Sequence, residues 1–171
     1  YGSDPEDILS FNDLAITDGL EVGAVIIVPD GEISAPAQQP STGRPVPKYV
    51  RGGGPDLGGY YQAPLSSWRK TQGVHGYNGV DLAAPRGTPV YASASGVVIT
   101  ARGSGWNGGY GKYVAISHQN GTQTLYAHLD SVSIESGWNV ARGQLIGLVG
   151  NTGKSTGVHL HFEVRGAKNP F

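Results

Sequence analysis

The chain has 171 residues, a formal net charge of −1 at pH 7 and only 15% charged residues. It carries no basic stripe with interleaved aromatic residues, which argues against a nucleic-acid-binding surface. Cysteine is absent, so the chain has no disulfide framework, and any zinc site must use histidine and carboxylate ligands. The longest aliphatic run, residues 22–28, is far too short for a membrane span.

The first 64 residues divide into two parts by composition. In residues 1–30, Asp4 and Pro5 indicate the start of a helix, and residues 22–28 predict a strand. Residues 31–64 are rich in proline, glycine, serine and glutamine and have almost no aliphatic periodicity. That composition is typical of a linker followed by an irregular lead-in.

After residue 64 the pattern predicts β-strands joined by tight turns, and no helix. Apolar and β-branched residues alternate or run together in six segments, namely residues 88–92, 96–101, 113–118, 122–128, 144–150 and 158–165. Asn120-Gly121 predicts a hairpin between two of these strands. Arg86-Gly87 and Arg142-Gly143 each precede a strand, which indicates a duplicated hairpin motif. The fold class is therefore mainly β.

Two histidines, His159 and His161, are separated by one residue near the end of the chain. In a strand, residues i and i+2 point to the same face, so the two imidazoles lie side by side and Leu160 faces the opposite way. Imidazole is the commonest protein ligand for zinc and the commonest general base near neutral pH. A packed or surface histidine is the alternative interpretation for any single histidine, and we expect that role for His118.

Five segments, in a fixed order, resemble the M23 zinc metallopeptidases, which are lysostaphin-like or LytM-type peptidoglycan endopeptidases. They are Asn-Gly-Val-Asp-Leu-Ala-Ala-Pro at 78–85, Gly-Thr-Pro-Val-Tyr-Ala at 87–92, Tyr-Ala-His-Leu at 126–129, Gly-Gln-Leu-Ile-Gly at 143–147 and Gly-Val-His-Leu-His-Phe-Glu at 157–163. The resemblance covers residues 65–171. It implies an antiparallel β-sheet with a substrate groove, of the duplicated hybrid-motif type.

The same resemblance implies a catalytic Zn²⁺ held by a histidine, an aspartate and the second histidine of the pair. Asp81 and His161 match the last two positions. Many family members carry the first histidine four residues before the aspartate, where this chain has Tyr77. His75 lies six residues before Asp81, and a glycine-rich loop could bring it to the metal. We therefore expect His75, Asp81 and His161 to be the ligands, and a degenerate site in which Tyr77 has removed a ligand is the alternative.

The family's two catalytic histidines match His128 and His159. One would take a proton from water and return it to the leaving amine, and the other would stabilise the developing oxyanion; the sequence does not say which is which. Tyr77 and Tyr126 are candidates for an added phenolic donor. Glu163 shares a strand face with His161, so it is either a partner of the ligand imidazole or a carboxylate at the groove rim.

The N-terminal unit resembles the second half of a LysM module, which binds glycans that contain N-acetylglucosamine. Residues 7–14 and 20–29 carry this resemblance, and the first strand and helix of a whole module are missing. We therefore expect three parts: a partial LysM-like module at 1–30, a linker and lead-in at 31–64, and an M23 peptidase domain at 65–171.

The leading hypothesis is a monomeric zinc endopeptidase that hydrolyses peptide cross-links of bacterial peptidoglycan. Its partners would be peptidoglycan stem peptides, with glycan strands as further candidates, and no nucleic acid. D-Ala–diaminopimelate cross-links are the first choice of substrate and glycine bridges the second. Because methionine is absent even at position 1, we expect a processed chain that acts outside the cytoplasm, in the periplasm, on the cell wall or in the medium.

Two alternatives belong to other functional classes. A catalytically inactive M23-like protein would bind the cell wall or activate an amidase, and the absence of bound zinc would identify it. A lipoyl- or biotinyl-carrier-like domain would need a lysine at an exposed hairpin tip, and none is convincing. Residues 31–64 could also lie across the groove and inhibit it.

Overall fold

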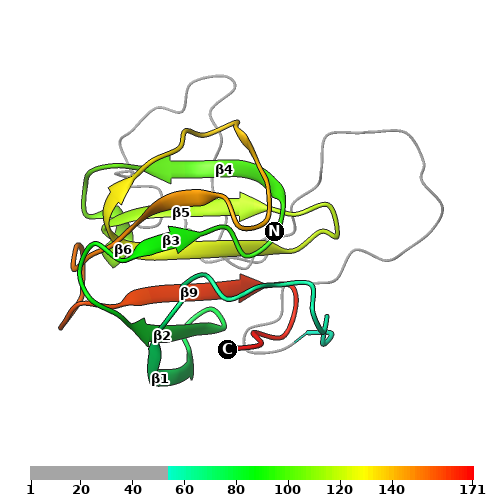
Figure 1. Cartoon of the computed structure of the whole chain (residues 1–171), viewed down its shortest axis with the longest axis horizontal. Helices are drawn as coiled ribbons and strands as arrows, with labels where there is room; N and C mark the ends of the chain where they lie inside the picture. The colour runs from blue at the N-terminus through cyan, green and yellow to red at the C-terminus, as the bar shows by residue number, and fades with distance from the viewer. Residues whose placement is uncertain (1–53) are drawn as a thin grey trace, which may run out of the picture.

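The computed structural model describes residues 54–171, which form a nine-stranded antiparallel β-sheet (Figure 1). The strands are β1 (Arg69–His75), β2 (Gly79–Ala83), β3 (Pro89–Tyr91), β4 (Gly96–Arg102), β5 (Lys112–Ser117), β6 (Gln123–Val132), β7 (Asn139–Val140), β8 (Leu145–Val149) and β9 (Leu160–Arg165). Within the described part of the chain the only helical element is a 3-10 turn, η1 (Asn107–Gly109). The expectation of a mainly β fold is confirmed, while the predicted unit at 1–30 lies outside the described residues.

The main path of the sheet runs β1-β2-β9-β6-β5-β4-β7. Off this path, β3 pairs with β8, and β8 also pairs with β6. The last strand, β9, is therefore inserted between β2 and β6, two strands that are far from it in sequence (Figure 1). This insertion places His161 on an interior strand of the sheet, and His159 directly before that strand.

All six predicted strands are present, and the predicted hairpin joins β5 to β6. At its turn the amide of His118 donates to the carbonyl of Thr122 over 2.9 Å, and Gly121 has a φ of +81°. The sequence did not reveal β1, because its first six residues are exposed and no buried face imposes an alternating pattern.

The two Arg-Gly segments form equivalent turns before paired strands. Gly87 and Gly143 have φ angles of +81° and +82°. The amide of Gly87 donates to the carbonyl of Val149, and the amide of Gly143 donates to the carbonyl of Ala92, each over 2.8 Å. Because β3 pairs with β8, these turns support the predicted duplication of a hairpin motif.

The core lies mainly on one face of the sheet. In β9 the residues Leu160, Phe162 and Val164 are all 0% exposed and belong to this core. Burial of a side chain of this size contributes about 1.5–3 kcal/mol. Because successive strand residues point to opposite faces, His161 and Glu163 are directed to the other face.

The lead-in segment 54–64 contacts the same core. Tyr61 is 7% exposed and belongs to the core cluster, and Leu57 and Tyr60 pack against it. No helix among residues 54–171 is long and apolar enough to cross a lipid bilayer.

Candidate metal and catalytic site

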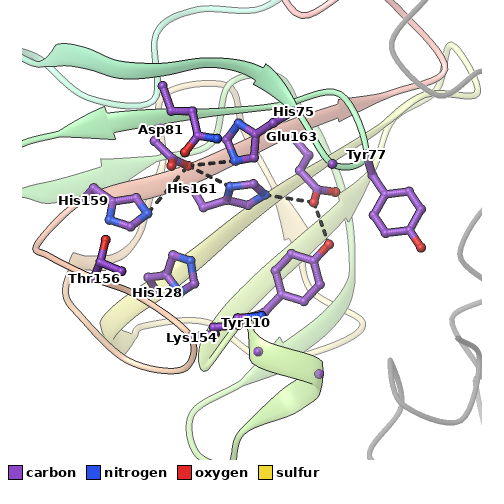
Figure 2. A pocket seen from close by; sticks show the side chains of 14 residues that line it. His75, Tyr77, Asp81, Tyr110, His128, Lys154, Thr156, His159, His161 and Glu163 are labelled. Carbon is purple, nitrogen blue, oxygen red and sulfur yellow. Dashed lines mark hydrogen bonds and ion pairs between the residues drawn. The ribbon is translucent and has the colours of Figure 1, made fainter.

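A cavity of about 470 Å³ opens on the face of the sheet opposite the main core. It is lined by the β1–β2 hairpin, the η1 segment, His128 of β6, the loop before β9 and β9 itself (Figure 2). All five residues predicted from the sequence as ligands or catalytic groups line it, namely His75, Asp81, His128, His159 and His161. The described residues of the lead-in, 54–64, do not line the cavity.

The turn between β1 and β2 allows His75 to reach the cavity. Gly76 and Asn78 adopt left-handed conformations, with φ of +52° and +62°, which glycine and asparagine tolerate best. The buried Asn78 side chain donates to the carbonyls of Val164 and Ala167 over 2.6 and 2.7 Å. These bonds anchor the turn to the end of β9.

The imidazole of His75 is oriented by its own strand. Its Nδ1 lies 2.8 Å from the carbonyl oxygen of Gly73, so Nδ1 carries the proton. Its Nε2 is left 3.4 Å from Oδ1 of Asp81. The spacing of six residues between His75 and Asp81 is thus compatible with a shared site.

The register between β2 and β9 brings Asp81 and His161 together. The two residues are direct partners across the antiparallel pair, and Nδ1 of His161 lies 2.9 Å from Oδ1 of Asp81. One donor atom each from His75, Asp81 and His161 lies within 4.8 Å of the other two. Two imidazole nitrogens and one carboxylate oxygen form a donor set suited to zinc, with a fourth position left for water or substrate.

Tyr77 occupies a different position from His75. The guanidinium of Arg165 lies 5.2 Å from the centre of its ring. Figure 2 shows the ring of Tyr77 directed away from Asp81 and His161. In this arrangement His75, and not Tyr77, faces the carboxylate.

His128 and His159 stand beside the three candidate ligands. Their ring centroids are 4.9 Å apart, and Nε2 of His159 lies 3.6 Å from Oδ1 of Asp81. Nδ1 of His128 donates to the carbonyl of Thr152, and Nδ1 of His159 donates to that of Gly157, each over 2.8 Å. These bonds leave the lone pair of each neutral imidazole on Nε2, the atom available for proton transfer.

His128 is held in an unusual backbone conformation with φ of +61°. Such an angle is rare outside glycine and is often found at functional positions. Burial lowers the pKa of His128 to about 4, and the hydrogen bond to Thr152 opposes this only in part. The ring is therefore a neutral acceptor at neutral pH.

Two neighbouring carboxylates shift the pKa of His161. Burial lowers the pKa of His161, but hydrogen bonds from its ring to Asp81 and Glu163, and their charges, outweigh burial and raise it to about 9. The pKa of Asp81 is lowered because His161 and the neighbouring histidines outweigh the opposing effect of burial. The imidazole of His161 thus lies between two carboxylates, those of Asp81 and Glu163, which favour positive charge on the ring.

The structure places Glu163 beneath the cavity, not at its rim. Glu163 is 0% exposed, and its Oε1 lies 3.0 Å from Nε2 of His161. Of the two interpretations open from the sequence, the partner of the ligand imidazole fits this position.

Tyr110 was not identified from the sequence. It lines the cavity, and its hydroxyl donates to Glu163 over 2.6 Å. The sequence signal that could have identified Tyr110 as a site residue is its position in the glycine-rich segment Gly108–Gly111, since glycine lets the backbone approach a site closely. The suggestion of Tyr126 as a phenolic donor is wrong, because this residue is 0% exposed and its hydroxyl accepts from the amide of Ser93 over 2.8 Å.

Residues 75–171 match the sequence profile described as Peptidase family M23. The chain is 53% identical over 108 residues to "DD-carboxypeptidase/endopeptidase Mpg" of Neisseria meningitidis serogroup B, covering 63% of this chain and 23% of that protein. It is 49% identical over 94 residues to "Peptidoglycan DD-endopeptidase ShyA" of Vibrio cholerae, covering 55% of this chain and 21% of that protein. The matched region thus spans less than a quarter of either relative.

The fold is similar to that of a solved peptidase structure. The antimicrobial peptidase lysostaphin from Staphylococcus simulans matches with a TM-score of 0.51 at 31% sequence identity, covering 67% of this chain and 46% of that chain.

Proposed function

We propose that this chain, which belongs to peptidase family M23, is a zinc-dependent endopeptidase that hydrolyses peptide cross-links of bacterial peptidoglycan. One observation carries the proposal: donor atoms of His75, Asp81 and His161 lie within 4.8 Å of one another, and two more histidines line the same cavity. The names of the relatives Mpg and ShyA support the same reaction class.

The residues fit a catalytic zinc better than a structural one, since the three donors do not close a four-coordinate shell. A zinc ion at this site would polarise the scissile carbonyl and lower the pKa of an attacking water to about 7. His161 would bind through Nδ1, the nitrogen that faces Asp81. His75 would bind through Nε2, because its Nδ1 is engaged by Gly73.

Proton transfer falls to His128 and His159. Each keeps a proton on Nδ1 through its bond to a backbone carbonyl, so Nε2 accepts a proton from water or returns one to the leaving amine. Once protonated, the second imidazole would donate to the developing oxyanion.

The position of Lys154 favours a substrate whose cross-link carries a negative charge. It lines the cavity, its amide donates to the carbonyl of Gly109 over 2.7 Å, and no carboxylate among the described residues forms an ion pair with its ammonium. In a D-Ala–diaminopimelate cross-link a carboxylate sits on the carbon next to the scissile nitrogen, whereas glycine bridges carry no charge there. We therefore place the diaminopimelate cross-link ahead of glycine bridges.

The proposal includes an extracytoplasmic location, where peptidoglycan is found. It also retains the division into a partial LysM-like module at 1–30, a linker and lead-in at 31–64 and a peptidase domain at 65–171.

The test is digestion of purified cell walls of the two cross-link chemistries, with mass spectrometry of the released fragments. We expect the wild type to open D-Ala–diaminopimelate links, and the His161→Ala variant to release nothing. Lys154→Gln should raise KM for this substrate by up to about fivefold, the worth of an exposed charge pair, with kcat little changed. Zinc-loaded wild type that releases no fragment from either wall would refute the proposed activity and favour the inactive wall-binding alternative.

A further inference from the structure

The buried carboxylate of Glu163 makes hydrogen bonds through both of its oxygens. Its two oxygens contact different groups. Oε1 lies 3.0 Å from Nε2 of His161 and accepts the hydroxyl of Tyr110 over 2.6 Å. Oε2 accepts from Nε and Nη2 of Arg165 over 2.7 and 2.6 Å. Both oxygens of this buried carboxylate therefore have hydrogen-bond partners. Figure 2 shows the contacts of Glu163 with His161 and Tyr110.

The ion pair of Glu163 with Arg165 is almost fully removed from water, with side chains 1% and 10% exposed. A buried ion pair carries a desolvation penalty, and replacing one with well-packed apolar residues is often neutral or stabilising. Core packing alone therefore does not explain an ionic pair at this position. Its placement directly against a candidate metal ligand suggests a role in the site.

The geometry of Glu163 determines which nitrogen of His161 is available. A carboxylate can only accept hydrogen bonds, and Tyr110 already donates to the same oxygen, so Nε2 of His161 must carry a proton. When the ring is neutral, its lone pair then lies on Nδ1, the atom that faces Asp81. A bond from the far nitrogen of a ligand imidazole to a carboxylate also raises the basicity of the ligand.

The ring of His161 is also confined from the side of β2. A Cβ added to Gly79 would lie 2.5 Å from Cε1 and 2.8 Å from Nε2 of the imidazole. The ring therefore lies between the Gly79 backbone and the carboxylate, and Arg165 holds that carboxylate in place. No other described carboxylate contacts Nε2 of His161.

We propose that Glu163 is a positioning residue that holds His161 with Nδ1 turned toward the metal, and that Arg165 fixes Glu163 in the orientation this requires. The inference rests on the proposed metal site but does not depend on which bond the protein cleaves.

The first experiment compares zinc affinity in Glu163→Gln and wild type, by competition with a chromophoric chelator. We expect the variant to bind zinc about 10–100-fold more weakly, as is usual when the partner of a ligand imidazole is removed. Both proteins are titrated at the same series of pH values, so that a change in proton competition at the ligand imidazole appears as a difference that varies with pH. Equal zinc affinity in the two proteins would overturn the proposal.

The control is Asp130→Asn, which removes a carboxylate from an ion pair with Arg86 outside the cavity. We expect its zinc affinity to equal that of the wild type. Denaturant unfolding of the three proteins without added zinc separates a structural role of Glu163 from a positioning role. If the role is only structural, Glu163→Gln lowers the free energy of unfolding and leaves the zinc affinity of the folded fraction unchanged, a result that would also count against the proposal.

The second experiment uses the wild type, so it tests the proposal even where the Glu163→Gln protein does not fold. Long-range ¹H–¹⁵N NMR of the zinc-loaded wild type identifies the coordinated nitrogen of each imidazole. We expect His161 to be metal-bound at Nδ1 and protonated at Nε2. Coordination through Nε2 would overturn the positioning role, whereas zinc-loaded protein with the expected tautomer but no wall digestion would refute only the proposed activity.

Discussion

Gly79 offers the sharpest test of the site geometry, because a single methyl group added there meets a candidate metal ligand. The Cβ of an alanine would lie 2.5 Å from Cε1 of His161, and ordinary contact begins at 3.4 Å. The imidazole, or the β2 backbone, must therefore move by about 0.9 Å. Metal–ligand distances are defined to within about 0.2 Å, so a shift of this size is incompatible with the site as it stands.

We expect two measurable effects of Gly79→Ala. Overpacking of a closely packed contact costs about 1–3 kcal/mol in the free energy of unfolding. Zinc affinity should fall by more than about tenfold, since the ring is displaced from both Asp81 and Glu163. Denaturant unfolding measures the first effect, and chelator competition with metal analysis measures the second.

Gly73→Ala is the matched control. Gly73 lies in the exposed strand β1, no heavy atom lies within 4 Å of its added Cβ, and its φ is not in the left-handed region. Its carbonyl remains available to His75, so we expect the free energy of unfolding to change by less than about 0.5 kcal/mol and zinc binding to persist. If Gly79→Ala binds zinc as tightly as Gly73→Ala, the position inferred for the His161 ring is wrong.

Three further predictions concern single side chains. His75→Ala should lose bound zinc while Tyr77→Phe keeps it, as measured by metal analysis; the reverse result would make Tyr77 the group that matters. His159→Ala should retain zinc but lose at least about 100-fold in turnover on cell walls, and unchanged turnover would remove it from the mechanism. Burial lowers the pKa of His118, against an opposing hydrogen bond to Ser95, so its folded-state pKa lies below the unfolded value of about 6.5. The contribution of neutral His118 to the free energy of unfolding is therefore complete above about pH 6.5 and is lost as the pH falls through the folded-state pKa, by up to about 1.4 kcal/mol per pH unit. In unfolding titrations the stability of His118→Gln should depend less steeply on acid pH than that of the wild type, and an unchanged slope would refute this.

The amino-acid sequence by itself determined the strands that carry a strong pattern. In β9 the alternation of Leu160, His161, Phe162 and Glu163 places apolar and polar groups on opposite faces, and this follows from the period of a strand alone. The turn at Asn120-Gly121 is equally local, because its backbone conformation favours these residue types. The exposed strand β1 left no such signal, since neither of its faces is buried.

Only the tertiary structure decided how the site converges. The distance between His75 and Asp81 depends on the left-handed turn at Gly76 and on the contacts that anchor Asn78, which no spacing rule specifies. The approach of Asp81 to His161 depends on the register of β2 with β9, strands about 80 residues apart in the chain. Local patterns indicate which face a side chain occupies, but pairing between distant strands determines which side chains share that face. The family resemblance therefore named the five site residues, whereas their distances and orientations came only from the tertiary structure.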